Sequence, residues 1–181
     1  MRVAITGGIG EGKSTVLQML EEIGYSTLSA DAVARQIAAR GDVAQTLARI
    51  AGLEHPFAPA ELRAALAGSE EIRRQVNATM HPLVMEEIDR HPATFVEVPL
   101  LIEACLQSTF DRIWVVTCGP REQKRRLMQR YGDKRHVEGI LSTQLSSRAK
   151  IPFADVVLRT NRPLDHVRRL LSEAASELAV R

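Results

Sequence analysis

Features that mark several specialised classes of protein are scarce in this sequence. It has two cysteines, Cys105 and Cys118, and their separation fits neither a zinc site nor a disulfide framework. No secretory signal is visible, and no apolar run approaches the roughly 20 residues needed to cross a bilayer. The net charge of +2 gives no overall affinity for polyanions. We therefore expect a cytoplasmic protein with reduced thiols and without a membrane or nucleic-acid partner.

The order of apolar and helical patterns indicates the fold class. We expect short strands at 2–6, 25–28, 94–98, 112–117 and 155–158. Helical patterns separate these strands, which favours parallel pairing with right-handed crossovers. No internal repeat or low-complexity tract divides the 181 residues. We predict one α/β domain, residues 1–181, with three layers (α/β/α) in which a five-stranded parallel sheet is the middle layer.

Two mainly helical regions interrupt this alternation. The region of about 60–91 has no strand signal, and Pro82 is expected to split it into two helices because proline disrupts a helix interior. The region of about 120–150 is expected to hold a basic helix that ends at Arg130 and a second helix over 134–147. It carries nine Lys or Arg residues against three acids. This excess indicates an anionic ligand, although a solvated helix face is the alternative.

The motif with the clearest chemistry lies near the N-terminus. Residues 7–14 read GGIGEGKS and fit G-x-x-x-x-G-K-[ST], between an apolar strand and a helix expected to begin at Lys13. Such a loop aims backbone N–H groups at phosphate, the lysine reaches the β- and γ-phosphates, and the Ser14 hydroxyl ligates Mg²⁺. We therefore expect a nucleoside triphosphate and Mg²⁺ as ligands. The expected nucleotide-binding residues of the loop are Gly8, Ile9, Gly10, Glu11, Gly12, Lys13, Ser14 and Thr15.

Two acidic residues follow strands of the expected sheet. Asp31 comes after the strand at 25–28, at the edge where open parallel sheets bind ligands. It is expected to take a proton from an acceptor hydroxyl; the alternative is a helix N-cap. Glu97 ends the next strand, where a carboxylate can reach Mg²⁺ through water, and a half-buried strand residue is the alternative.

The loop alone does not distinguish a kinase from a GTPase switch or a motor ATPase. The guanine-reading motif Asn-Lys-x-Asp is missing from the sequence. The acid after the second strand and the basic helices of 120–150 favour a kinase, because such helices can close as a lid and exclude water. A nucleotide-dependent switch stays open as an alternative. A nucleic-acid role is disfavoured because no aromatics are interleaved with the basic residues.

Several motifs together resemble the dephospho-coenzyme A kinase family. They are TGGIGEGKST at 6–15, SADAVARQ at 29–36, HPLV at 81–84, VPLLIE at 98–103, RLMQR at 126–130, Gln144 and ADVVLxxN at 154–161. The resemblance implies a P-loop NTPase fold with a helical substrate-binding insertion and a helical lid. It also implies transfer of the γ-phosphoryl of ATP to the 3′-hydroxyl of dephospho-CoA by a monomer or weak homo-oligomer. The alternative is another P-loop nucleoside, nucleotide or small-metabolite kinase.

The resemblance implies roles for individual side chains. Lys13 and Arg130 flank the phosphates, with Arg130 arriving from the lid, and Asn161 lies beside the adenine. Arg35 binds acceptor phosphate or keeps Asp31 ionised. The expected substrate-binding residues are Asp31, Arg35, Arg63, His81, Pro99 and Leu100, and the expected metal ligands are Ser14 and Glu97.

The chain departs from the family pattern inside the phosphate loop. Glu11 stands where the family usually has serine. We expect its side chain to point to solvent, while its backbone N–H still serves the loop.

Overall fold

The computed structural model describes residues 1–179, which form two compact units. One unit comprises residues 1–28 together with the chain from Ala93 onward, and the other comprises Ser29–Pro92. The second unit begins well before residue 60, so it contains helices that precede the expected insertion at about 60–91. No helix within residues 1–179 combines the length and apolar character needed to span a bilayer.

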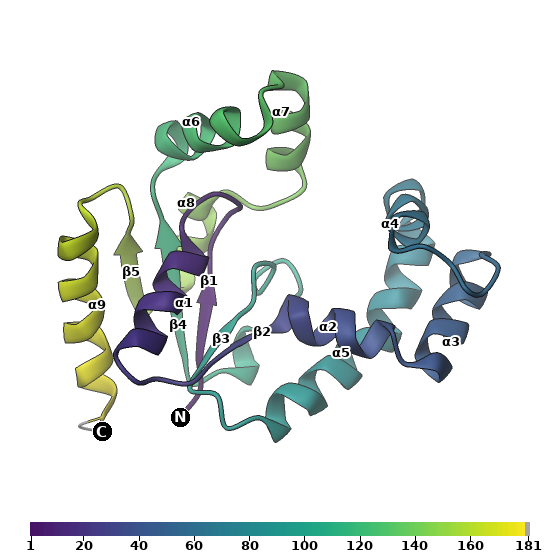
Figure 1. The fold of residues 1–181 in the computed structure, drawn as a ribbon, viewed down its shortest axis with the longest axis horizontal. Helices are drawn as coiled ribbons and strands as arrows, with labels where there is room; N and C mark the ends of the chain where they lie inside the picture. Colours follow the sequence, from purple (N-terminus) through teal and green to yellow (C-terminus); the bar gives the residue numbers. More distant parts are fainter. Residues whose placement is uncertain (180–181) are drawn as a thin grey trace. The chain divides into compact units, whose positions relative to one another are not determined.

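A five-stranded sheet forms the centre of the first unit (Figure 1). Its strands are β1 (Val3–Thr6), β2 (Thr27–Ser29), β3 (Phe95–Glu97), β4 (Arg112–Thr117) and β5 (Val156–Arg159). Their order is β2-β3-β1-β4-β5, with β1 parallel to both β3 and β4 and β4 parallel to β5. All four residues of β1 are buried, as expected for a central parallel strand. The predicted α/β fold with a five-stranded parallel sheet is confirmed.

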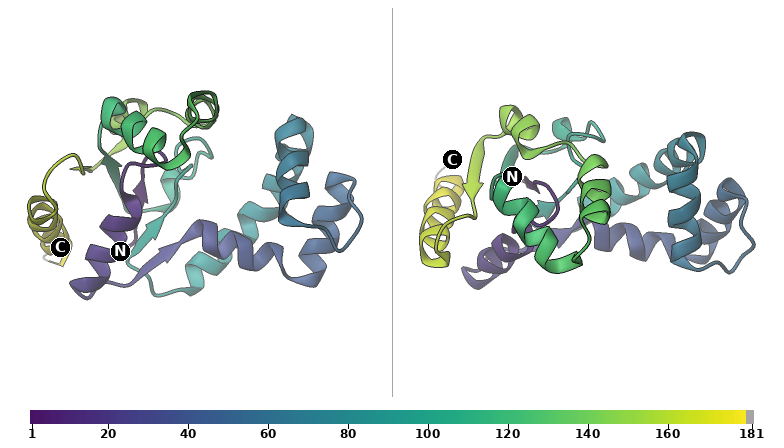
Figure 2. Two further views of the ribbon diagram at one scale, coloured as in Figure 1. Left: turned by 45° about the horizontal axis from the view of Figure 1, so that its top comes forward. Right: turned by 90° about the horizontal axis from the view of Figure 1, so that it is seen from above.

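The core of this unit lies between the sheet and two helices, α1 (Lys13–Glu22) and α9 (Leu164–Ala179). These helices lie side by side, and α9 also contacts β5 (Figures 1 and 2). Phe95 packs edge-on against both Tyr25 and Trp114, with ring centroids 5.2 and 5.0 Å apart. This packing holds β1 and α1 firmly, so the turn that joins them is mounted on a rigid frame.

The chain between β4 and β5 is helical. The helix predicted over 134–147 begins at Lys134 as expected, but its predicted end is wrong, because the helix stops at Ser142. The elements here are α6 (Pro120–Tyr131), α7 (Lys134–Ser142), α8 (Ser147–Lys150) and the 3-10 turn η2 (Ile151–Phe153). The hydroxyl groups of Ser142 and Thr143 donate to carbonyl oxygens of the last turn of α7. Ser146 then caps α8 by accepting from the Ala149 N–H. These local bonds compete with helix continuation, so α7 ends and a new short helix begins.

Apart from Ser29, which ends β2, the regular secondary structure of the second unit is helical (Figure 2). Its helices are α2 (Ala30–Ala38), α3 (Gly41–Ala51), α4 (Pro59–Gly68) and α5 (Glu70–Arg90). The other three helices all pack on α5. The predicted break at Pro82 is wrong, because α5 continues through it. Val76 and Met80 before the proline and Ile88 after it are all buried, and this packing offsets the hydrogen bond that proline removes.

Candidate functional site

The phosphate loop connects β1 to α1 and is tightly packed. A Cβ atom on Gly7 would lie 2.2 Å from the Val116 carbonyl oxygen of β4, so no other residue fits there. Gly12 has a φ of 94° and is the N-cap of α1, a left-handed conformation that glycine adopts at low cost. The first N–H groups of α1 have no acceptor within the helix, and Ser14 and Thr15 are exposed. The geometry is that of an anion site at a helix N-terminus.

Lys13 lies over this loop and close to an acid. Its side chain is mostly buried, and Nζ donates to the carbonyl oxygens of Gly7 at 3.0 Å and Gly8 at 3.1 Å. Nζ is also 3.9 Å from Glu97 Oε1, because the register of β1 and β3 places Glu97 opposite Ile5. The structure therefore brings Lys13 and Glu97 together at the loop, as two neighbouring parallel strands should.

The expected outward orientation of Glu11 is wrong. Its side chain is 1% exposed, and its oxygens accept three hydrogen bonds. Gly8 N–H and Ser147 Oγ donate to Oε2, the former at 2.7 Å, while Thr117 Oγ1 donates to Oε1 at 2.9 Å. These donors satisfy the carboxylate inside the protein, which removes the reason for it to face water. Two of them lie more than 100 residues away, so no local pattern could have revealed them.

Helix α6 contacts the phosphate loop directly. Gln123 Nε2 donates to the Ile9 carbonyl at 2.9 Å, and Arg126 Nη1 donates to the Gly10 carbonyl at 3.4 Å. Arg126 also donates through Nη2 to the Thr160 carbonyl at 2.8 Å. Sequence reasoning missed Gln123 and Arg126 as individual residues, although Arg126 opens the RLMQR motif. Arg126 is therefore the residue of α6 whose guanidinium group hydrogen-bonds to the loop.

Arg130 lies elsewhere on α6. It is exposed in the last turn, and its guanidinium lies 5.3 Å from the centroid of the Tyr131 ring. The position of Arg130 in this structure does not bring it to the phosphate loop.

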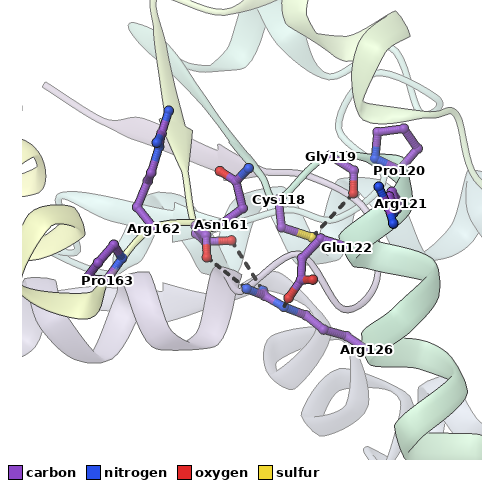
Figure 3. A pocket seen from close by; sticks show the side chains of 10 residues that line it. Cys118, Gly119, Pro120, Arg121, Glu122, Arg126, Asn161, Arg162 and Pro163 are labelled. Atoms are coloured by element: carbon purple, nitrogen blue, oxygen red, sulfur yellow. Dashed lines mark hydrogen bonds and ion pairs between the residues drawn. The ribbon is translucent and has the colours of Figure 1, made fainter.

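A pocket of about 640 Å³ adjoins the loop (Figure 3). Its lining residues are Cys118, Gly119, Pro120, Arg121, Glu122, Arg126, Thr160, Asn161, Arg162 and Pro163. Arg126 and Thr160 line the pocket and also contact the phosphate loop. Arg126 donates to the Gly10 carbonyl, and Thr160 Oγ1 donates to the Glu11 carbonyl at 2.6 Å. The volume suits a small-molecule ligand. Asn161 therefore lies in a pocket that adjoins the loop.

Two titratable groups of the pocket have shifted pKa values. Hydrogen bonds from Arg125 and Arg126 lower the pKa of Glu122 to about 2, so this carboxylate is ionised at neutral pH. Burial raises the pKa of the Cys118 thiol, which therefore stays protonated there. The pocket is thus lined by three arginines and one acid, and the acid, Glu122, is paired with Arg126.

The remaining predicted residues of this unit follow β3. The Pro99 carbonyl accepts from Thr6 Oγ1 at 3.3 Å and from Lys150 Nζ at 2.8 Å, and Leu100 is exposed. Lys150 is completely buried and pairs with Glu103 at 2.9 Å. Sequence reasoning gave Glu103 no chemistry. The structure shows that it neutralises a buried lysine, whose ammonium group in turn holds the turn after β3.

Four of the expected site residues lie in the helical unit, namely Asp31, Arg35, Arg63 and His81. Asp31 is exposed in the first turn of α2, and the N-cap is Ser29, whose Oγ accepts from the Ala32 N–H at 3.4 Å. The N-cap alternative for Asp31 is therefore wrong. Arg35 is also exposed, and within residues 1–179 it forms no ion pair with Asp31.

Two more predicted acceptor-binding residues belong to this unit. Arg63 is exposed on α4, and His81 is half-buried on α5.

A magnesium ion would find suitable ligands at the loop. Within residues 1–179, no cluster of three or more His, Cys, Asp and Glu side chains could hold a metal ion alone. Ser14 and Glu97 supply a hydroxyl and a carboxylate, which are oxygen ligands of the kind Mg²⁺ prefers when phosphate oxygens complete the shell.

The parallel sheet, the phosphate loop and α1 define a protein of the P-loop NTPase class. A solved shikimate kinase from Acinetobacter baumannii shares this fold, with a TM-score of 0.54 and 14% identity over 99% of this chain and 93% of that one. The chain belongs to the dephospho-CoA kinase family, because the model of that family matches residues 1–165.

Individual relatives agree with this assignment. The dephospho-CoA kinase of Escherichia coli K12 is 34% identical over 172 residues, which cover 88% of this chain and 84% of that protein. The dephospho-CoA kinase of Bacillus cereus is 33% identical and covers 88% of each chain. The solved structure of TT1252 from Thermus thermophilus has a TM-score of 0.84 and 29% identity, over 98% of this chain and 97% of that one.

Proposed function

We propose that this protein transfers the γ-phosphoryl group of ATP to the 3′-hydroxyl of dephospho-CoA, giving CoA and ADP. The observation that carries the proposal is the phosphate loop with Lys13 and Glu97 beside it, in a chain of the dephospho-CoA kinase family. Both substrates carry phosphates, so binding depends on converging N–H groups and cations. We also propose that the protein acts in the cytoplasm, as a monomer or weak homo-oligomer.

ATP occupies the phosphate loop and the neighbouring pocket. Its phosphates accept from backbone N–H groups of the loop and from Lys13, whose ammonium group exchanges the Gly7 and Gly8 carbonyls for phosphate oxygens. The nucleoside lies in the pocket beside Asn161, and Arg121 also lines this pocket. Binding therefore uses the carboxyl edge of β1, β4 and β5, as is general for open α/β sheets.

Asp31 takes the proton from the attacking 3′-hydroxyl. The exposure of its carboxylate and its place directly after β2 support this role. Arg130 moves toward the transferring phosphoryl group when the lid of about 120–150 closes, which stabilises charge and excludes water. Mg²⁺ held by Ser14 and Glu97 neutralises charge on the phosphates.

The remaining residues are proposed to bind the acceptor. Arg35 and Arg63 bind its phosphates, and His81 contacts it from the helical insertion of about 60–91. Pro99 and Leu100 supply contacts from the turn after β3, where Leu100 is 44% exposed and the Pro99 carbonyl is fixed by Lys150.

The alternative is a kinase that shares the fold but uses another acceptor. A gluconokinase from Sinorhizobium meliloti, for example, has a TM-score of 0.51 with 16% identity, over 99% of this chain and 95% of that one. Release of ADP from ATP should be measured with dephospho-CoA, shikimate, gluconate, adenosine and nucleoside monophosphates. We expect dephospho-CoA to give the highest kcat/KM by far. Better turnover of any other acceptor would show that the proposed substrate is wrong.

A further inference from the structure

The side chain of Glu11 lies inside the protein although the residue stands in the middle of the phosphate loop. It is 1% exposed. A buried carboxylate costs free energy unless its oxygens are hydrogen-bonded. Both oxygens of Glu11 are used, and all three donors are uncharged.

The three donors belong to different parts of the chain. Gly8 is in the loop itself, Thr117 ends β4, and Ser147 begins α8. The carboxylate therefore fastens the loop to a strand end and to a helix start. A second bond ties the loop to the segment between α7 and α8, because Gln144 Oε1 accepts from the Ile9 N–H at 3.1 Å.

These bonds restrict the shape of the loop. The side chain of Glu11 holds the Gly8 N–H at 2.7 Å, three residues back along the chain, and so closes a ring within the loop. Its carbonyl is held as well, by Thr160 Oγ1 at 2.6 Å. The shape of the loop decides where the N–H groups at the start of α1 point. A displacement of about 1 Å in such a site can lower the rate roughly 100-fold.

We propose that Glu11 is a positioning residue for the triphosphate, which acts by fastening the phosphate loop to Thr117 and Ser147. This inference rests on the proposed function for the identity of the ligand. The side chain of Glu11 touches neither substrate, and its effect passes through the backbone of the loop. The hydrogen bonds of the side chain carry the effect, rather than its charge.

The test compares two replacements of Glu11 by their ATP affinity, measured calorimetrically with Mg²⁺ and without acceptor. Glu11→Ala leaves three buried donors without an acceptor, and we expect it to weaken ATP binding by about 10- to 100-fold. Glu11→Gln keeps an acceptor for Gly8 and Ser147, and the Thr117 hydroxyl can turn to accept from the new amide. We expect its ATP affinity to stay within about threefold of the wild type.

Ser147→Ala tests the same link from its other end and keeps the test meaningful if Glu11→Ala fails to fold. We expect it to weaken ATP binding by about 3- to 10-fold. In the double variant, the losses should be less than multiplicative, because both changes remove one shared bond. Glu177→Ala, an exposed carboxylate on α9, is the matched control and should bind ATP like the wild type.

Two results would overturn the inference. The first is wild-type ATP affinity in folded Glu11→Ala or, if that variant does not fold, in Ser147→Ala. The second is a Glu11→Gln variant as impaired as Glu11→Ala, which would assign the effect to charge. These measurements need no acceptor, so their outcome does not depend on whether the proposed function is right. The proposed function is tested separately, and it is wrong if dephospho-CoA does not make the wild type release ADP from ATP.

Discussion

The ammonium group of Lys13 donates to two carbonyl oxygens of the loop that it serves. Replacing it with alanine removes the positive charge nearest the proposed phosphate site. We expect Lys13→Ala to weaken ATP binding by about 10-fold or more and to lower kcat as well, since charge-assisted hydrogen bonds are the stronger ones. Calorimetric titration with ATP and a coupled ADP assay measure the two effects. Unchanged ATP affinity would contradict the role assigned to Lys13.

Asp31 should behave differently from Lys13. Asp31→Asn keeps the size of the side chain but cannot accept a proton, so we expect ATP affinity within about threefold and a kcat lowered by about 10²- to 10⁴-fold. The matched control is Asp42→Asn, an exposed acid in the first turn of α3, which should leave kcat unchanged. If Asp31→Asn instead lost ATP binding as severely as Lys13→Ala, Asp31 would act as a structural or metal-binding residue.

Single residues show where sequence reasoning stops. The loop, Lys13 and Glu97 could be placed together from the sequence because a motif and parallel strand order determine their positions. The burial of Glu11 and the contact of Arg126 with the loop could not, since both depend on partners distant in the chain. Side-chain direction in a loop follows from tertiary donors and acceptors, which a local pattern does not reveal.

At the scale of elements, the N-terminal half of α6 contains a compact charge cluster. Arg125 and Arg126 both donate to Glu122, and they lower its pKa to about 2 from its ordinary value of 4.5. Because the pKa is lower in the folded state, ionised Glu122 favours folding at pH above 4.5. That contribution is lost as the pH falls from 4.5 toward 2.

Glu122→Gln tests this pH dependence. We expect the wild type to have the higher Tm above about pH 4.5, by a few degrees at most, because the cluster is partly exposed and solvent screens its charges. The difference should shrink toward zero near pH 2. Thermal unfolding of both proteins between pH 2 and 7 at low salt measures it. An equal difference in Tm at pH 2 and pH 7 would contradict the assigned pKa.

Strands were more predictable than helix ends in this chain. The five strands lie within a residue or two of the expected positions, because continuous apolar runs mark buried parallel strands. The errors at Pro82 and at 143–147 have opposite causes. Tertiary packing keeps α5 continuous despite proline, whereas serine and threonine hydroxyl groups end α7 in a stretch with no proline or glycine.

The whole molecule has two cores, one in each compact unit. Trp114 is the only tryptophan and is buried in the core of the sheet unit, whereas the regular structure of the second unit is helical apart from Ser29. We expect urea to unfold the helical unit first, since a smaller unit buries less apolar surface. The circular dichroism signal at 222 nm should then begin to fall before Trp114 fluorescence changes. Coincident curves would show that the two units unfold as one.

The fold class could be predicted at this scale, but the division of the chain could not. Alternating strands and helices indicate a parallel sheet whatever the connections contain. The helical unit takes in α2 and α3, which look from the sequence like ordinary crossover helices. Their apolar faces pack on α5, and periodicity does not reveal which element a helix packs against.

The closeness of Gly7 to the Val116 carbonyl has a consequence for changing this protein by mutagenesis. With 2.2 Å available for a Cβ atom, even alanine would force the first residue of the loop away from β4. Gly24 and Gly52 lie in open space, so their side-chain replacements meet no steric obstacle, only the cost of a positive φ. A library that randomised every glycine would therefore keep Gly7 invariant among active clones, while other residues appeared at Gly24 and Gly52.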